Sequence, residues 1–138
     1  MRTLVLLVAV AIVGVVVAAA RIPEGEVAEL VTFDRNGRAI ETDLWIVELG
    51  GEAWVRAPGA DASWLQRVRD NPTAHLVRDE GLVSVRTVSS EDPVVRRAVN
   101  RAMQARYGRL ERAYSWFRDP ERTVPVQLVP VSTGAPGA

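Results

Sequence analysis

The sequence predicts an α+β fold in which six short strands form a barrel-like sheet with two or three helices, preceded by an N-terminal transmembrane helix. Three observations predict it. Residues 4–20 are apolar and uncharged, short strand-like segments separated by turn residues follow, and segments with helical periodicity interrupt them. The 138 residues suit one domain. We therefore expect a membrane anchor over residues 1–21, a barrel domain over 22–131 and a disordered tail over 132–138.

The composition excludes several kinds of functional site. The chain has no Cys, which excludes disulfides, thiolate catalysis and Cys-based zinc sites. Its single histidine, His75, makes a multi-histidine metal site impossible, and every basic side chain is Arg, which rules out a lysine base or Schiff base. The formal net charge is +0, so no electrostatic footprint points to nucleic acid. We expect neither a metal nor a nucleic acid as a partner.

The apolar run near the N-terminus has three interpretations. As a helix, residues 4–20 would span about 25 Å, at the short end for a bilayer core of about 30 Å. Ala18 and Ala20 sit at a plausible signal-peptide cleavage position, and a buried core helix is the third alternative. The run is longer than most signal-peptide h-regions, so we expect a retained single-pass anchor. Basic residues on both sides of the run leave the side of the barrel domain open.

Strand-like patterns account for most of the remaining chain. Apolar and β-branched residues recur with period two or in short runs, and two glycine-containing pairs, Asn36-Gly37 and Gly50-Gly51, indicate hairpin turns. Pro125 and Pro130 lie in the last segment, which suits an edge strand or bulges because proline has no N–H to donate. The expected strands are residues 26–33, 38–49, 52–56, 73–78, 82–89 and 123–131.

The helical segments have start and stop signals. Asp61 is placed to cap a helix over residues 62–71, which Pro72 ends. Asp92, followed by Pro93 at the first helical position, favours a second helix that ends at Gly108. Residues 110–117 form one or two further helical turns before Asp119 and Pro120.

One stretch resembles a known family. A hairpin that ends in Arg56 is followed by a Gly-containing loop and by Ser-Trp-Leu-Gln-Arg-Val-Arg-Asp-Asn-Pro over residues 63–72. This order is similar to that of the split β-barrel, pyridoxamine-phosphate-oxidase-like proteins, and in particular to the deazaflavin (F420)-dependent nitroreductase and quinone-reductase branch. The resemblance covers roughly residues 36–131. It implies a six-stranded split β-barrel, a homodimer, and F420 or FMN as cofactor.

The resemblance also implies where the cofactor would bind. Its phosphate would lie where the strand ending at Arg56 meets the following helix, held by Arg56, Ser63 and Arg67 beside Trp64. Arg56→Ala would then weaken cofactor binding while leaving the melting temperature nearly unchanged. For Trp45 there are two interpretations, core packing or stacking on the cofactor ring. The loop before the helix is poorer in glycine than that of the family, and Asp61 would repel a phosphate unless it only caps.

Two functions are compatible with these patterns. The first is a membrane-anchored deazaflavin- or flavin-dependent reductase that acts on a quinone or another lipophilic electron acceptor. The second is a non-catalytic, membrane-tethered binding module on the same barrel. His75 has no Ser and acid partners at a recognisable spacing, so we expect it to be structural. The sequence identifies no catalytic residue, which is compatible with a reductase because the cofactor carries the hydride.

Overall fold

The computed structural model describes residues 27–78, 81–117 and 119–131. The expected anchor over residues 1–21 and the expected tail over 132–138 lie outside this range. Among the described residues, none of the helices has the length and apolar character that a membrane span requires.

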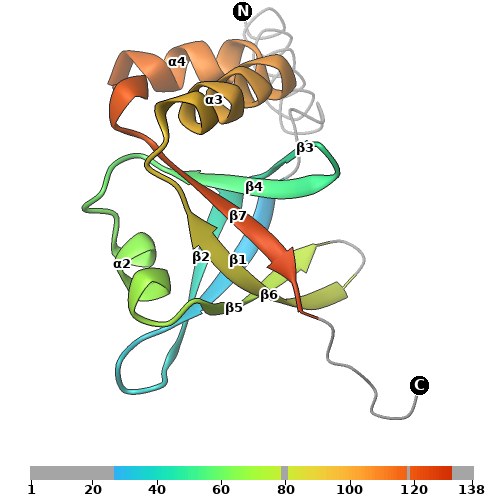
Figure 1. Cartoon of the computed structure of the whole chain (residues 1–138), viewed down its shortest axis with the longest axis vertical. Coiled ribbons are helices and arrows are strands. Elements are labelled where there is room, and N and C mark those ends of the chain that lie inside the picture. The colour runs from blue at the N-terminus through green and yellow to red at the C-terminus, as the bar shows by residue number, and fades with distance from the viewer. Residues whose placement is uncertain (1–26, 79–80, 118, 132–138) are drawn as a thin grey trace, which may run out of the picture.

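A single antiparallel sheet forms the body of the described chain and curls into a barrel that stays open along one side (Figure 1). It has seven strands in the order β2-β1-β5-β6-β7-β4-β3. The α+β barrel expected from the sequence is therefore confirmed, with seven strands instead of six. The strands are β1 (Val27–Phe33), β2 (Ala39–Trp45), β3 (Val47–Leu49), β4 (Glu52–Ala57), β5 (Thr73–Arg78), β6 (Gly81–Ser89) and β7 (Val124–Pro130).

The seventh strand arises because the chain turns a corner at Ile46. The sequence predicted one strand over residues 38–49, but β2 pairs with β1 while β3 pairs with β4. Between them, the backbone N–H of Ile46 donates to the Tyr107 hydroxyl at 2.9 Å, and that hydroxyl donates to the Ile46 carbonyl at 2.7 Å. A side chain thus replaces the neighbouring strand at this one residue. The continuous apolar run gave no sign of the break.

The prolines of β7 do not put this strand at an edge, because β7 pairs with β6 on one side and β4 on the other. Pro125 faces the end of β6, where the Ser90 N–H donates to the Pro125 carbonyl at 3.0 Å. Pro130 lies beyond Leu128, the last residue of β7 that pairs with β4. Each proline therefore lies where the pairing of β7 with one of its two neighbours ends, so its missing N–H group costs no hydrogen bond between strands. The expected edge position was wrong for that reason.

The turns and helix ends follow local signals, with one exception. Gly50 and Gly51 have φ angles of 62° and 80°, as the predicted two-residue turn between β3 and β4 requires. Asp92 accepts a hydrogen bond from the Val94 N–H at 2.9 Å and caps α3 (Pro93–Tyr107) as expected. Asp61 does not cap α2 (Ser63–Asp70), whose N-cap is Ala62, so that prediction was wrong. The helices are completed by α4 (Arg109–Phe117) and the 3₁₀ turn η1 (Pro120–Arg122).

Two apolar clusters hold the helices against the sheet. Trp64, Leu65 and Val68 of α2 pack into the barrel interior with inward-facing residues of β1, β4, β5, β6 and β7. On the outer face of β3 and β4, α3 buries Val99 and Met103 together with Val47. Figure 1 shows α3 and α4 side by side over this end of the barrel, with α2 at a separate position. The region between β2 and β4 is where the barrel stays open.

Candidate functional site

The candidate site lies at this opening. β2 and β4 contact each other without pairing in the sheet. A cavity of about 200 Å³ lies between them and is lined by Leu44 and Trp45 of β2, by Arg56 of β4 and by Pro58 after it, with Asp43 at its side. Its walls are mostly apolar, and Trp45 offers a flat aromatic surface. Such a wall suits one face of a planar ring.

Arg56 lines this cavity, but its guanidinium group is bound to side chains of α3 and α4. It is only 7 % exposed, although it is charged. One guanidinium nitrogen donates to the Asn100 side-chain oxygen at 2.9 Å, and another pairs with the buried carboxylate of Glu111. These contacts join β4 to α3 and α4. A buried cation requires such a partner, because desolvation of an unpaired charge is costly.

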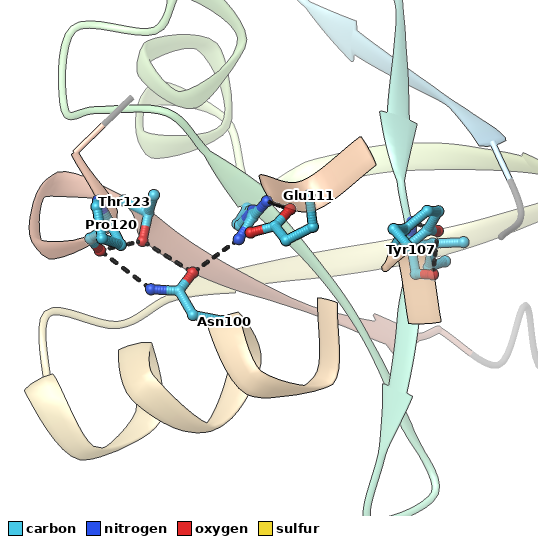
Figure 2. A network of polar contacts seen from close by, with 7 residues as sticks. Asn100, Tyr107, Glu111, Pro120 and Thr123 are labelled. Carbon is cyan, nitrogen blue, oxygen red and sulfur yellow. Dashed lines mark hydrogen bonds and ion pairs between the residues drawn. The ribbon is translucent and has the colours of Figure 1, made fainter. Parts of the chain in front are cut away.

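Asn100 extends this pairing into a network, which Figure 2 shows. Its side-chain oxygen also accepts from the Thr123 hydroxyl at 3.2 Å, and its amide nitrogen donates to the Pro120 carbonyl at 3.0 Å. The Thr123 hydroxyl also lies 2.9 Å from the Pro120 carbonyl oxygen. One partly buried polar network therefore links β4, α3, α4, η1 and the residue before β7. The resemblance implied that Arg56 binds a phosphate, whereas in the structure its guanidinium group binds Asn100 and Glu111.

The other residues of the predicted phosphate site lie on α2 and point to different places. Arg67 donates through its Nε to the Thr32 hydroxyl of β1 at 2.7 Å and lines a different cavity, beside the β1–β2 turn. Trp64 is buried and packs in the barrel core. Ser63 is exposed at the first residue of α2. The structure therefore does not bring Arg56 and Arg67 to one anion-binding cluster.

Trp45 packs in an apolar cluster and also borders the cavity at the opening. Its ring stacks on that of Tyr107, with centroids 4.5 Å apart and planes 12° apart. It packs against the cluster under α3, as does Trp54, which confirms the core packing expected for Trp45. Trp45 also lines the cavity at the opening. Tyr107, which fixes both Trp45 and the corner at Ile46, was missed, and only its place on the apolar face of α3 could have indicated it.

His75 lies outside this region. It is half-buried on β5, its ring meets that of Phe33 edge to face at 5.5 Å, and its Nδ1 is 3.2 Å from the Ser84 hydroxyl across the β5–β6 pair. Among the described residues, no carboxylate forms a hydrogen bond with the other ring nitrogen. These contacts are those of a side chain that packs between strands.

The sequence itself matches no protein-family model and no curated protein. Solved structures are similar in three dimensions. They include HutZ, the heme storage protein of Vibrio cholerae, with a TM-score of 0.62 and 15 % identity over 77 % of this chain and 82 % of that one. An F420 reductase has a TM-score of 0.54 and 14 % identity over 77 % of this chain and 86 % of that one. A NimC/NimA family protein of Clostridium acetobutylicum has a TM-score of 0.56 and 14 % identity over 76 % of this chain and 74 % of that one.

The chain has a split β-barrel fold. This confirms the fold that the resemblance of residues 36–131 implied. At identities of 14–15 % the likeness concerns the fold alone. The opening between β2 and β4 is the split of this barrel.

Proposed function

We propose that this chain is a membrane-anchored, flavin- or deazaflavin-dependent reductase that acts on a quinone or another lipophilic electron acceptor. The observation that supports it best is the aromatic-walled cavity at the split of a barrel whose solved relatives in shape include an F420 reductase. An anchor over residues 4–20 would hold the barrel near acceptors dissolved in the bilayer. The bound cofactor would supply the hydride.

The residues of this chain fit the ring system of such a cofactor better than its phosphate. Trp45, Leu44 and Pro58 form a wall that suits a planar ring. The pairing of Arg56 with Glu111 and the hydrogen bond from Arg67 to Thr32 argue against these two arginines as phosphate donors. We therefore assign ring contacts to Trp45 and leave Ser63, at the exposed start of α2, as the proposed phosphate contact.

The size of the cavity supports a homodimer. Ligand sites for molecules of cofactor size usually enclose about 300–1,000 Å³. The cavity at the split encloses about 200 Å³ within one chain. A second copy that covers the split would enlarge and close it. We therefore propose that two chains together form the cofactor site.

The pairing of Arg56 and Arg67 with protein groups favours a second function, a tethered binding module without cofactor. One experiment separates the two. The full chain is purified in an uncharged detergent, incubated with FMN or with F420, and tested for bound cofactor by absorbance and mass analysis, then for quinone reduction. Saturable binding that Trp45→Ala weakens supports the reductase. Absence of binding by both cofactors supports the module.

The anchor and the dimer have their own tests. Intact-mass analysis of protein extracted from membranes should give a chain that retains residues 4–20, and a chain beginning at Arg21 would contradict the anchor. Analytical ultracentrifugation in density-matched detergent should give the mass of two chains. The mass of one chain at micromolar concentration would contradict the shared cofactor site.

A further inference from the structure

The helices α3 and α4 carry a charge imbalance that the whole chain does not. The formal net charge of the chain is +0, yet residues 93–117 contain six arginines and one acidic residue. That acidic residue, Glu111, is buried against Arg56 of β4. Five of the six arginines are exposed, Arg96 is half-buried and donates to the Thr123 carbonyl, and no exposed carboxylate lies on the same elements. The arginines are Arg96, Arg97, Arg101, Arg106, Arg109 and Arg112.

Three of these arginines surround one hollow. A cavity of about 250 Å³ lies between α3, α4 and η1, and Arg97, Arg101 and Arg112 line it. Arg97 and Arg101 are spaced four residues apart on α3, so their like charges lie on one helix face and destabilise it. An anion between them would remove that repulsion. The side-chain amides of Asn100 and Gln104 add polar groups to the same lining.

Two residues that line this hollow, Asn100 and Glu111, are bound to other parts of the chain. Asn100 is fixed by its bonds to Arg56, Thr123 and Pro120. The charge of Glu111, which also lines the hollow, is balanced by Arg56. At the rim, the exposed Glu121 of η1 is one carboxylate against the two guanidinium groups of Arg97 and Arg101 on α3.

We propose that this hollow binds a phosphate group, either as free phosphate or as the phosphate of a small ligand or a lipid headgroup. Guanidinium groups bind phosphate oxygens through paired N–H donors, and several that converge give both affinity and orientation. The volume admits a phosphate with a small substituent but is below the range of cofactor-sized sites. The site is separate from the split of the barrel and does not depend on the reductase proposal.

The test is calorimetric titration of the full chain, in an uncharged detergent at low salt, with inorganic phosphate. Arg101→Gln should weaken binding by about tenfold, the effect of losing one charge-assisted contact. Glu121→Gln should tighten it, because the opposing charge is removed. Arg109→Gln is the matched control, since Arg109 is exposed on α4 but does not line the hollow. It should keep the affinity of the wild type.

Two results would overturn the proposal. One is the absence of saturable phosphate binding at millimolar concentrations. The other is an equal loss in Arg101→Gln and Arg109→Gln, which would mean that the basic surface attracts anions without a site. A parallel titration with a water-soluble short-chain phosphatidate distinguishes the sources. Affinity well above that for phosphate, and lost in Arg101→Gln, identifies a lipid headgroup, whereas equal affinity identifies a free phosphate.

Discussion

Removal of one oxygen atom, by Tyr107→Phe, should destabilise the barrel strongly. The hydroxyl both accepts from the Ile46 N–H and donates to the Ile46 carbonyl, at 2.9 and 2.7 Å. Ile46 is 2 % exposed and Tyr107 is 3 % exposed, so water does not reach these groups readily. A buried backbone group left without a partner costs about 1–3 kcal/mol. Two such groups give about 2–6 kcal/mol, and partial relaxation of the corner favours the lower half of this range.

The assay is chemical denaturation of the full chain, followed by the fluorescence of its tryptophans. Tyr107→Phe keeps the ring, so the stacking on Trp45 is preserved and the change reports on the hydroxyl. Met103→Leu is the matched control, because it alters the same cluster at nearly constant volume and should cost less than about 1.5 kcal/mol. If Tyr107→Phe costs less than the control does, the hydroxyl does not replace the missing ladder bonds, and the explanation of the break between β2 and β3 is wrong.

Two further predictions concern charges. Arg56→Met should lower the free energy of unfolding by about 3–5 kcal/mol, since it leaves Glu111 buried and unpaired. Arg56→Met combined with Glu111→Leu should recover most of that loss in the same denaturation assay. A double variant no more stable than the single one would contradict this. The second concerns Asp34, because the backbone N–H of Arg38 donates to its carboxylate and holds the pKa of that group below its ordinary value of 3.8. A depressed pKa stabilises the folded state above the unfolded value, and this stabilisation is lost as the pH falls through the folded value. Asp34→Asn should therefore be less stable than the wild type at neutral pH, and the difference should shrink as the pH falls below 3.8 and disappear once the pH is below the folded-state pKa. A difference that persists when the carboxyl group is protonated in the folded state would show that the charge is not responsible.

The features that the sequence predicted well are those in which neighbouring residues decide the structure. The Gly50-Gly51 turn, the Asp92 cap with Pro93, and the helix end at Gly108 each need only a few consecutive residues. The prediction that Asp61 caps α2 was wrong, although it also depended only on neighbouring residues. The side chain of Asp61 is excluded from the cap because Ala62 takes the N-cap position, one residue later than a cap by Asp61 requires. The break between β2 and β3 at Ile46 was not predicted, because Tyr107, whose hydroxyl binds the backbone there, lies 61 residues further along the chain.

Arg56 shows why the candidate site was harder to predict than the fold. An arginine near the end of an apolar strand, close to a helix start, is typical of a ligand-binding residue, and the partners that change this interpretation lie 44 and 55 residues further along the chain. The sequence nevertheless held a signal. Val55 and Ala57 indicate that one face of this strand is buried, and Trp54, two residues before Arg56, indicates that the face of Arg56 is also covered. A buried cation needs an acidic partner. Residues 93–117 contain a single acid among six arginines. That acid, Glu111, is the residue that pairs with Arg56, and its withdrawal from the surface is what leaves the exposed side of α3 and α4 basic.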